Sequence, residues 1–183
     1  MVYEMEIAGL KRELPLFAVS DDLKIAAFII FSDVEMTVAS AKELLSKAPE
    51  FDIIMTAEAK SIPLIYEMAK QSGMNDYVVA RKGVKVYMED PICVEVNSIT
   101  TQNTQKLYLG KKEVELLKNK RVLIIDDVIS TGESLKAMEK LVEAAGGNIA
   151  GKMAILAEGD ANDREDIIVL EKLPVFNPDG TVK

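Results

Sequence analysis

One stretch of the chain decides the fold: VLIIDDVISTGES, residues 122–134. Four apolar and mostly β-branched residues lead to Asp126 and Asp127, and two further apolar residues lead to a run of hydroxyl residues around Gly132. A short run that is apolar at every position is typical of a strand buried on both faces, as in parallel sheets. This stretch therefore predicts a strand that ends at the acidic pair, a turn, and a helix that begins near Ser134.

Similar apolar runs recur along the chain, at residues 51–55, 77–80, 154–156 and 167–170. Segments with the apolar spacing of helices lie between them, at residues 38–48, 62–69 and 135–145. We expect the first helix to bury Val38, and the second to bury Tyr66 and to have Ser61 as its N-cap. Strands that alternate with helices in this order predict an α/β fold, an open parallel sheet with helices on both faces.

Residues 81–109 break this alternation, because no long helix fits there. Residues 94–96 and 107–109 predict the two strands of a β-hairpin, and the segment between them is polar and made of small residues. A long polar loop inside a compact domain is usually functional or mobile, so we predict a flexible lid. A plain solvent-exposed hairpin is the alternative.

Two similar short segments, LPLF at residues 14–17 and LPVF at residues 173–176, lie outside the alternating core. We expect residues 1–35 and 161–183 to form one small hood over an edge of the core, which spans about residues 36–160. Whether the two segments meet is left open by the sequence. The chain, residues 1–183, is then a single domain.

The composition excludes several classes of site and partner. The 183 residues carry 22 basic and 30 acidic side chains, a net charge of −8, with no histidine and one cysteine. A Ser-His-Asp triad, a histidine-ligated zinc and a disulfide framework within the chain are therefore excluded. The longest wholly apolar run, residues 25–31, is far shorter than the roughly 20 residues of a membrane span. We expect a cytoplasmic protein without nucleic-acid or membrane partners.

The acidic pair and the turn after it indicate a site for a phosphorylated sugar. Ligands of such folds bind beyond the carboxyl ends of the strands. Hydroxyls and backbone N–H groups at the start of a helix favour a phosphate, and Gly132 lets the backbone approach it. Two carboxylates suit the same ligand if it offers hydroxyls and a divalent cation is near. The alternative is an ordinary turn with two solvated aspartates.

These residues resemble a known family. VLIIDDVISTGES resembles the phosphoribosyl-pyrophosphate motif of the type I phosphoribosyltransferases. TAEAKSIP, residues 56–63, resembles the pyrophosphate loop of the adenine and xanthine enzymes, and VARKGVK, residues 79–85, resembles their second basic segment. NSITTQNTQ, residues 97–105, lies where the family has its lid. The resemblance covers about residues 50–160 in the family's order.

The resemblance implies a role for each matching residue. Asp126 and Asp127 would be the catalytic carboxylates, accepting hydrogen bonds from the ribose hydroxyls and helping, largely indirectly, to hold Mg²⁺, the implied cofactor. The 5′-phosphate would be bound by Ser130, Thr131, Gly132, Glu133 and Ser134. The pyrophosphate would be bound by Lys60, Ser61, Arg81, Lys82 and Lys85. The lid would contain Ser98, Thr100, Thr101 and Gln102.

The implied reaction is the transfer of ribose 5-phosphate from phosphoribosyl pyrophosphate to a purine base, in purine salvage, by an enzyme of the pentosyltransferase class. It passes through an oxocarbenium-like transition state, which positioned charges can stabilise without histidine. The base would stack on Ile129, Leu173 and Phe176, with Phe17 a weaker candidate. Xanthine and hypoxanthine enzymes tend to use a lysine near the fourth core strand, and AILAEGDA, residues 154–161, has none. Adenine is therefore favoured.

Several alternatives remain open. The base could be xanthine, hypoxanthine or guanine, or a pyrimidine such as orotate. Some relatives are non-catalytic regulators that sense phosphoribosyl pyrophosphate, although about 35 residues before the core are few for a DNA-binding domain. The resemblance also implies a homodimer.

Overall fold

The computed structural model describes residues 1–97 and 104–183. In this part of the chain the central sheet has the strand order β10-β9-β8-β4-β5, and each neighbouring pair is parallel. The predicted parallel sheet is therefore confirmed. Its strands are β4 (Ile53–Ala57), β5 (Val78–Ala80), β8 (Arg121–Ile129), β9 (Asn148–Glu158) and β10 (Ile168–Leu173).

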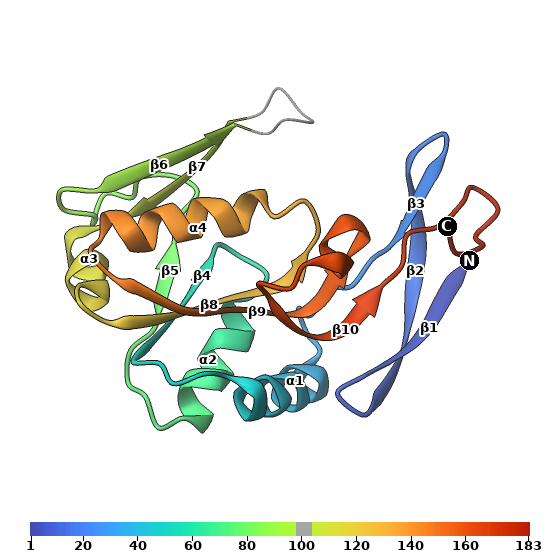
Figure 1. The fold of residues 1–183 in the computed structure, drawn as a ribbon, viewed down its shortest axis with the longest axis horizontal. Coiled ribbons are helices and arrows are strands. Elements are labelled where there is room, and N and C mark those ends of the chain that lie inside the picture. The colour runs from blue at the N-terminus through green and yellow to red at the C-terminus, as the bar shows by residue number, and fades with distance from the viewer. Residues whose placement is uncertain (98–103) are drawn as a thin grey trace.

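Helices cover both faces of this sheet, as predicted (Figure 1). Helices α1 (Val34–Lys47) and α2 (Ile62–Gln71) lie on one face, and α4 (Glu133–Ala144) lies on the other. The expected inward face of α4 is confirmed, since its predicted apolar residues are buried. The prediction that two residues would be buried is wrong: Val38 of α1 is 41% exposed and Tyr66 of α2 is 54% exposed. The buried faces run instead through Met36 and Leu44, and through Ile65 and Met68.

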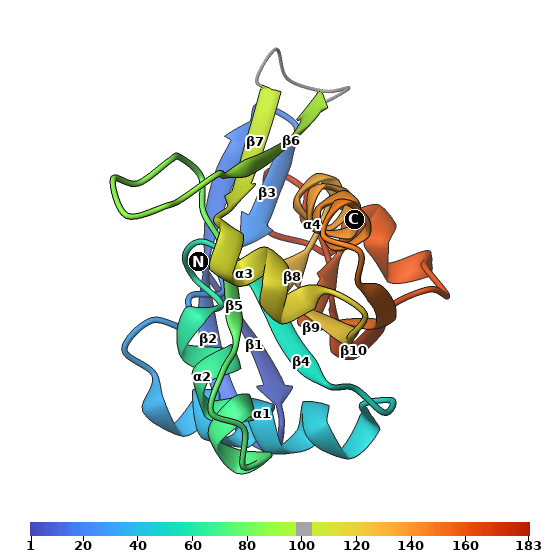
Figure 2. The same ribbon diagram turned by 90° about the vertical axis from the view of Figure 1, so that its left-hand side faces the viewer.

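The predicted hairpin is also present. Strands β6 (Ile92–Asn97) and β7 (Thr104–Leu109) are antiparallel and pack against α4, projecting from one end of the molecule (Figures 1 and 2). Backbone hydrogen bonds between Arg81 and Tyr108 join the hairpin to the end of β5. The short helix α3 (Lys111–Leu117), which follows the hairpin, was not predicted because it is too short to show a periodic pattern. The predicted lid residues Ser98, Thr100, Thr101 and Gln102 lie outside the described residues.

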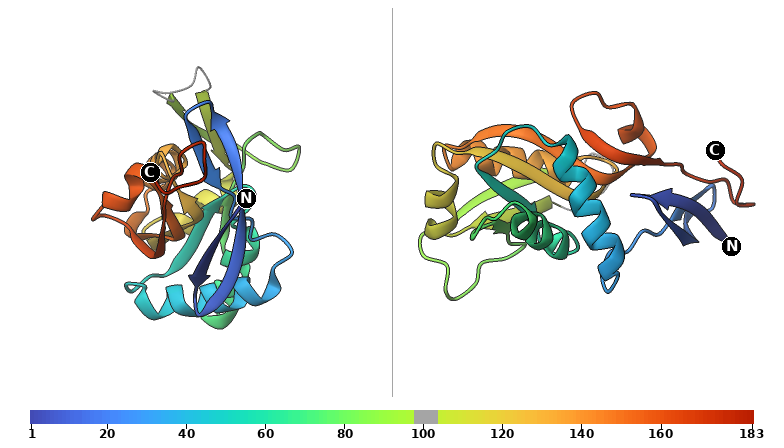
Figure 3. Two further views of the ribbon diagram at one scale, coloured as in Figure 1. Left: turned by 90° about the vertical axis from the view of Figure 1, so that its right-hand side faces the viewer. Right: turned by 90° about the horizontal axis from the view of Figure 1, so that it is seen from below.

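The two ends of the chain form one small sheet beside the core (Figure 3). Strands β1 (Val2–Ile7), β2 (Leu10–Ser20) and β3 (Leu23–Ala26) are antiparallel neighbours. Phe17 of β2 lies opposite Ile25, and Phe176 exchanges two backbone hydrogen bonds with Lys24, at 2.8 and 2.9 Å. Strand β3 therefore lies between the two Leu-Pro-x-Phe segments, with Phe17 paired to one edge of it and Phe176 to the other. We call this sheet, with Phe176, the hood.

None of the described helices is long and apolar enough to span a membrane.

Candidate functional site

The acidic pair lies within β8, not after it, so the predicted end of this strand is wrong. Pairing with β9 continues from Asp126 to Ile129 because β9 extends alongside as far as Glu158. Pairing with β4 ends earlier, at Ile124. One side of the strand is thus free to face the loop that joins β4 to α2, and the two aspartates stand on a rigid strand beside that loop.

The β4–α2 loop supplies a hydroxyl and a cation to the pair. Ser61 Oγ lies 2.9 Å from Asp126 Oδ1 and 3.3 Å from Asp127 Oδ1. A hydroxyl has one proton, so Ser61 donates to one carboxylate at a time. Lys60 Nζ lies 2.9 Å from Asp127 Oδ2, as an ion pair without the angle of a hydrogen bond. The structure therefore brings together the residues expected to bind ribose with two of those expected to bind pyrophosphate.

Burial and mutual repulsion change the acidity of the pair. The pKa of Asp126 is raised to about 7. The main cause is burial, and the second is the negative charge of the neighbouring Asp127. The hydrogen bonds from Ser61 and from the Asp127 backbone N–H act in the opposite direction. The pair therefore takes up a proton near neutral pH when no ligand is bound, and ligand hydroxyls or a cation would favour its charged form.

The loop from Ser130 to Ser134 has the form of a phosphate cradle. Together with Asp126 and the end of β8 it lines a small hollow of about 130 Å³. Gly132 is the N-cap of α4, with φ at 77°, a left-handed conformation that suits glycine. Gly132 makes no side-chain capping bond, and the start of a helix is a position that favours an anion.

The second basic segment is held in place by an acidic residue that the sequence reasoning missed. Glu58 Oε1 lies 3.1 Å from Arg81 Nη2, and Glu58 Oε2 accepts a hydrogen bond of 2.9 Å from the Lys82 backbone N–H. That hydrogen bond, with the charges of Arg81 and Lys85, lowers the pKa of Glu58. The available signal was the acidic residue inside TAEAKSIP, beside the predicted pyrophosphate loop.

Two buried polar atoms at this edge suit a ligand. Thr56 Oγ1 and Arg81 Nε have no hydrogen-bond partner within the part of the chain that the structure describes. Thr56 lies near the end of β4, and Arg81 follows the end of β5, the adjacent strand. Buried polar atoms are nearly always hydrogen-bonded, so a bound anion is an appropriate partner for them.

The chemistry of the acidic pair is also suited to Mg²⁺. Over residues 1–97 and 104–183, no group of three or more His, Cys, Asp or Glu side chains could hold a metal ion. Mg²⁺ commonly takes one or two protein carboxylates and completes its shell with phosphates and water. Asp126 and Asp127 match that donor set.

Two further residues near the phosphate loop were missed by the sequence reasoning. Glu158, at the end of β9, is 8% exposed and accepts a hydrogen bond from Ser130. Arg164 Nη1 lies 2.6 Å from the position that a Cβ on Gly132 would occupy, so its guanidinium packs against the turn. Asp166 holds the same guanidinium at 2.7 Å. Neither residue belongs to a motif, and only the fold places them here.

The three residues expected to stack on the base lie in the interior of the protein. Ile129, Leu173 and Phe176 are all buried, and Phe176 packs its ring edge-on against Tyr3 with centroids 5.0 Å apart. Phe176 is held in the hood by its bonds to Lys24, which is why it presents no open face for stacking. Phe17, the weaker candidate, is 56% exposed.

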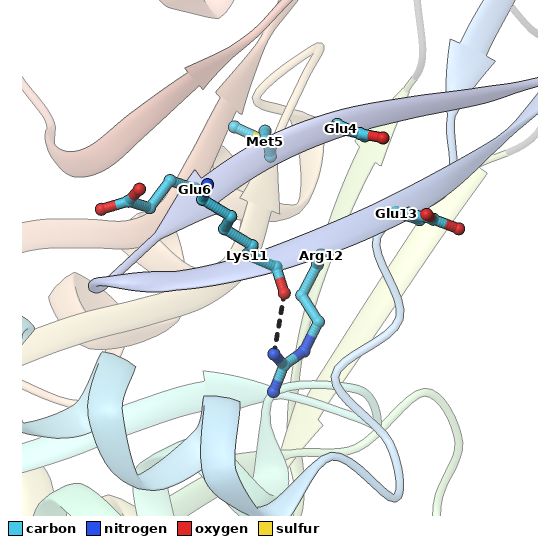
Figure 4. A pocket seen from close by; sticks show the side chains of 6 residues that line it. All are labelled: Glu4, Met5, Glu6, Lys11, Arg12 and Glu13. Atoms are coloured by element: carbon cyan, nitrogen blue, oxygen red, sulfur yellow. Dashed lines mark hydrogen bonds between the residues drawn. The ribbon is translucent and has the colours of Figure 1, made fainter.

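A separate hollow of about 410 Å³ lies on the β1–β2 hairpin (Figure 4). Its lining is mostly charged, with Arg12 pointing away from the hairpin toward α1. Arg12 Nε lies 2.7 Å from Asp33 Oδ2, ahead of that helix. None of its lining residues belongs to the strand ends or to the phosphate loop, so this hollow is not part of the candidate site.

Comparisons with known proteins agree with this geometry. The phosphoribosyl transferase domain matches residues 35–176. A xanthine phosphoribosyltransferase from Exiguobacterium sp. is 31% identical over 156 residues, which are 82% of this chain and 79% of that protein. The purine biosynthesis transcriptional repressor PurR of Bacillus subtilis is 31% identical over 114 residues, 62% of this chain and 39% of the repressor. An adenine phosphoribosyltransferase structure from Thermoanaerobacter pseudethanolicus has a TM-score of 0.66 at 25% identity, covering 94% of this chain and 95% of that one.

Proposed function

The chain belongs to the phosphoribosyl transferase domain family, and from this premise we propose that it transfers ribose 5-phosphate from phosphoribosyl pyrophosphate to a purine base. The products are a nucleoside monophosphate and pyrophosphate. The observation that carries the proposal is the contact of Lys60 and Ser61 with the acidic pair, next to the phosphate loop. A single substrate that carries a pyrophosphate, two ribose hydroxyls and a 5′-phosphate would contact Lys60 and Ser61, the acidic pair and the phosphate loop together.

The proposed mechanism uses positioned charge. Asp126 and Asp127 accept the ribose hydroxyls and favour positive charge on the sugar as the bond from C1 to pyrophosphate breaks. Lys60, Arg81 and Lys85 attract the departing pyrophosphate. Mg²⁺, when bound with the substrate, would supply further positive charge to that leaving group. Displacing Lys60 from Asp127 would free its ammonium group for the pyrophosphate.

We propose adenine as the base. A solved structure that aligns with 94% of this chain is an adenine phosphoribosyltransferase, and the segment after β9, residues 159–163, has no lysine to donate to a 6-oxo group. A xanthine enzyme is among the curated relatives, so a 6-oxopurine is the competing base. A homodimer in the cytoplasm is the setting that we propose from the family.

A panel of free bases tests the proposal. The chain is mixed with Mg²⁺, phosphoribosyl pyrophosphate and adenine, xanthine, hypoxanthine, guanine or orotate in turn, and nucleotide and pyrophosphate are measured. We expect product with adenine. Product with xanthine alone would reassign the base, and binding of phosphoribosyl pyrophosphate without product from any base would favour a sensor like the repressor relative.

A substitution in the acidic pair tests the site itself. Asp127→Asn should lower turnover by about 10²- to 10³-fold, because it removes a buried charge that stabilises the cationic sugar. Circular dichroism should show an unchanged fold. Asp160→Asn, the same change at an exposed aspartate after β9, is the control and should keep full activity. Full activity in Asp127→Asn would mean that the pair is not catalytic.

A further inference from the structure

Arg164 is a cation that the mechanism above does not use. It directly follows the short helix η1 (Gly159–Asp163), which lies between β9 and β10 in the chain. Its guanidinium donates two hydrogen bonds to Asp166, from Nε at 2.9 Å and from Nη2 at 2.7 Å. These two nitrogens form one edge of the planar group, which leaves Nη1 at the other edge.

The Nη1 edge of the guanidinium lies against the phosphate loop, residues 130–134. Nη1 is 2.6 Å from the position that a Cβ on Gly132 would occupy. Since Cβ atoms do not approach other heavy atoms this closely, the guanidinium occupies space that any side chain at position 132 would need. The hollow is lined by the loop, Asp126, the end of β8 and the first residues of α4. Arg164 therefore contacts the turn from outside that lining.

A set of ion pairs fixes this guanidinium in place. Lys152 of β9 contacts Asp166, and its Nζ lies 2.8 Å from Glu139 Oε1 of α4. The side chains of Lys152 and Arg164 are 17% and 31% exposed, so neither cation moves freely in solvent. Linked and partly buried ion pairs hold their geometry better than isolated pairs at the surface. Arg164 is thus held between the sheet and α4, beside the turn.

The phosphate loop has no positive side chain of its own. Its sequence, STGES, provides hydroxyls and one negative charge, that of Glu133. A phosphate ester carries a charge of about −1.5 to −2 near neutral pH, and the start of a helix offers only about half an elementary charge. A full positive charge beside the turn would therefore strengthen the binding of the 5′-phosphate.

We propose that Arg164 is a positioning residue for the 5′-phosphate. Held by Asp166, it supports the turn at Gly132 and adds its positive charge beside the bound group. This inference rests on the proposed function, which places the 5′-phosphate in this loop. The 5′-phosphate is remote from the bond that breaks at C1, so Arg164 acts on binding. It lowers the Kd and the KM of phosphoribosyl pyrophosphate and leaves kcat nearly unchanged.

A brace for the connection between β9 and β10 would explain the same ion pairs without any ligand. Loss of such a brace would lower the free energy of unfolding and would weaken the binding of all ligands alike, or of none. The proposed role confines the loss of affinity to ligands that carry a 5′-phosphate. The two roles are therefore separable by comparing ligands with and without that group.

The test compares Arg164→Gln with the unchanged chain by calorimetry in the presence of Mg²⁺. The Kd values for ribose 5-phosphate and for phosphoribosyl pyrophosphate should rise by about 10- to 30-fold, because a charge beside the phosphate is lost. The Kd for pyrophosphate, which would bind at Lys60 and Arg81, should stay within about twofold. In the full reaction KM should rise while kcat changes by less than about threefold. Arg164→Lys should restore part of the affinity, since it keeps the charge but not the fork to Asp166.

Two further variants complete the comparison. Asp166→Asn releases the guanidinium and should weaken the same two ligands, and the double variant should be no worse than Arg164→Gln because both changes act through one group. Arg121→Gln is the matched control. Arg121 forms a similar fork with Asp52, from Nε at 3.3 Å and from Nη2 at 2.9 Å, at the start of β8, the opposite end of that strand from the loop. All three affinities should be unchanged in this control.

The outcomes separate the inference from the proposed function. An unchanged affinity for ribose 5-phosphate in Arg164→Gln, or an equal loss for pyrophosphate, would overturn the positioning role. If Arg164→Gln does not fold, as judged by circular dichroism, Arg164→Lys and Asp166→Asn decide by the same criterion. If the unchanged chain binds ribose 5-phosphate but turns over no base, the proposed reaction alone is wrong. If it does not bind ribose 5-phosphate, the loop is not a site for the 5′-phosphate and the inference is wrong.

Discussion

The side chain of Ser61 forms a hydrogen bond in the candidate site and does not cap its own helix, α2. Serine at the start of α2 was predicted as an N-cap, yet its side chain makes no capping bond and donates to Asp126 at 2.9 Å. Pro63 explains part of this difference, because a proline at the second helical position has no N–H for a cap to accept. The rest is explained by Asp126, which lies 65 residues further along the chain and accepts the Ser61 hydrogen bond only because the fold brings the two residues together. Residue types were therefore predictable here, and their partners were not.

The acidity of Asp126 gives a prediction at the same scale. Its pKa is raised from 3.8 to about 7, so between about pH 4 and 7 the folded chain holds more protons than the unfolded chain. The free energy of unfolding of the ligand-free protein should therefore fall as the pH rises through this window. Urea denaturation between pH 5 and 8 measures the slope. Asp126→Asn should reduce that slope, leaving the part contributed by Glu158, which has the same sign.

Asp52 provides the control for this experiment. Hydrogen bonds from Arg121 lower its pKa to about 2, so its contribution to stability is present above about pH 4 and is lost only as the pH falls further. Asp52→Asn should leave the slope between pH 5 and 8 unchanged. An unchanged slope in Asp126→Asn would show that the aspartate does not titrate in this window.

The order of strands and helices was predictable where the apolar runs are continuous. The residues at which these elements end were not predictable. The run from Val122 to Ile125 predicted β8, but two carboxylates interrupt the pattern and hide its continuation to Ile129. Strand length here is decided by the partner β9, whose reach to Glu158 is a tertiary property. The hood strands were not predicted individually, because their half-buried residues share a short sheet that depends on both ends of the chain.

The beginning of α1 shows how a cap and an ion pair share one side chain. Asp33 Oδ1 accepts a hydrogen bond of 3.0 Å from the Met36 backbone N–H, and Arg12 of β2 contacts the same carboxylate. Asp33→Ala should lower the free energy of unfolding by about 1–2 kcal/mol, mostly through loss of the cap. The partly exposed ion pair adds less. Equilibrium urea denaturation measures the change.

Two variants separate these contributions. Asp33→Asn keeps a good capping group and should recover most of the loss. Glu35→Gln removes the other acidic partner of Arg12, which is largely exposed, and should change stability by less than about 0.5 kcal/mol. If Asp33→Asn is as damaging as Asp33→Ala, the link to the hood and not the cap stabilises this region.

The whole molecule combines an acidic chain with a locally basic site. The net charge of −8 gave no indication of a polyanion ligand. The relevant charges are local: Lys60, Arg81 and Lys85 gather at the ends of two adjacent strands, where Glu58 holds the segment that carries the last two. Net charge therefore describes the surface as a whole and does not predict its binding site.

The hood offers a matched pair of phenylalanines for a test of its role in stability. Phe176 is 1% exposed and joins the hood to the core, whereas Phe17 is 56% exposed on the other side of β3. Phe176→Ala should lower the free energy of unfolding by about 3–5 kcal/mol, because it leaves a cavity between Tyr3 and the end of β10. Phe17→Ala should change it by about 0.5 kcal/mol or less. Equal losses would mean that the hood and the core are not joined through Phe176.

The position of β3 between the two ends of the chain has a consequence for synthesis on the ribosome. Strands β1 to β3 leave the ribosome before the core strands and can form their antiparallel ladder early, but one edge of β3 pairs with Phe176, which emerges after every core strand. An unpaired strand edge is a template for association with other chains. The edge of β3 therefore stays unpaired in the nascent chain until Phe176 has been synthesised. We expect nascent-chain chaperones to bind this edge during that time.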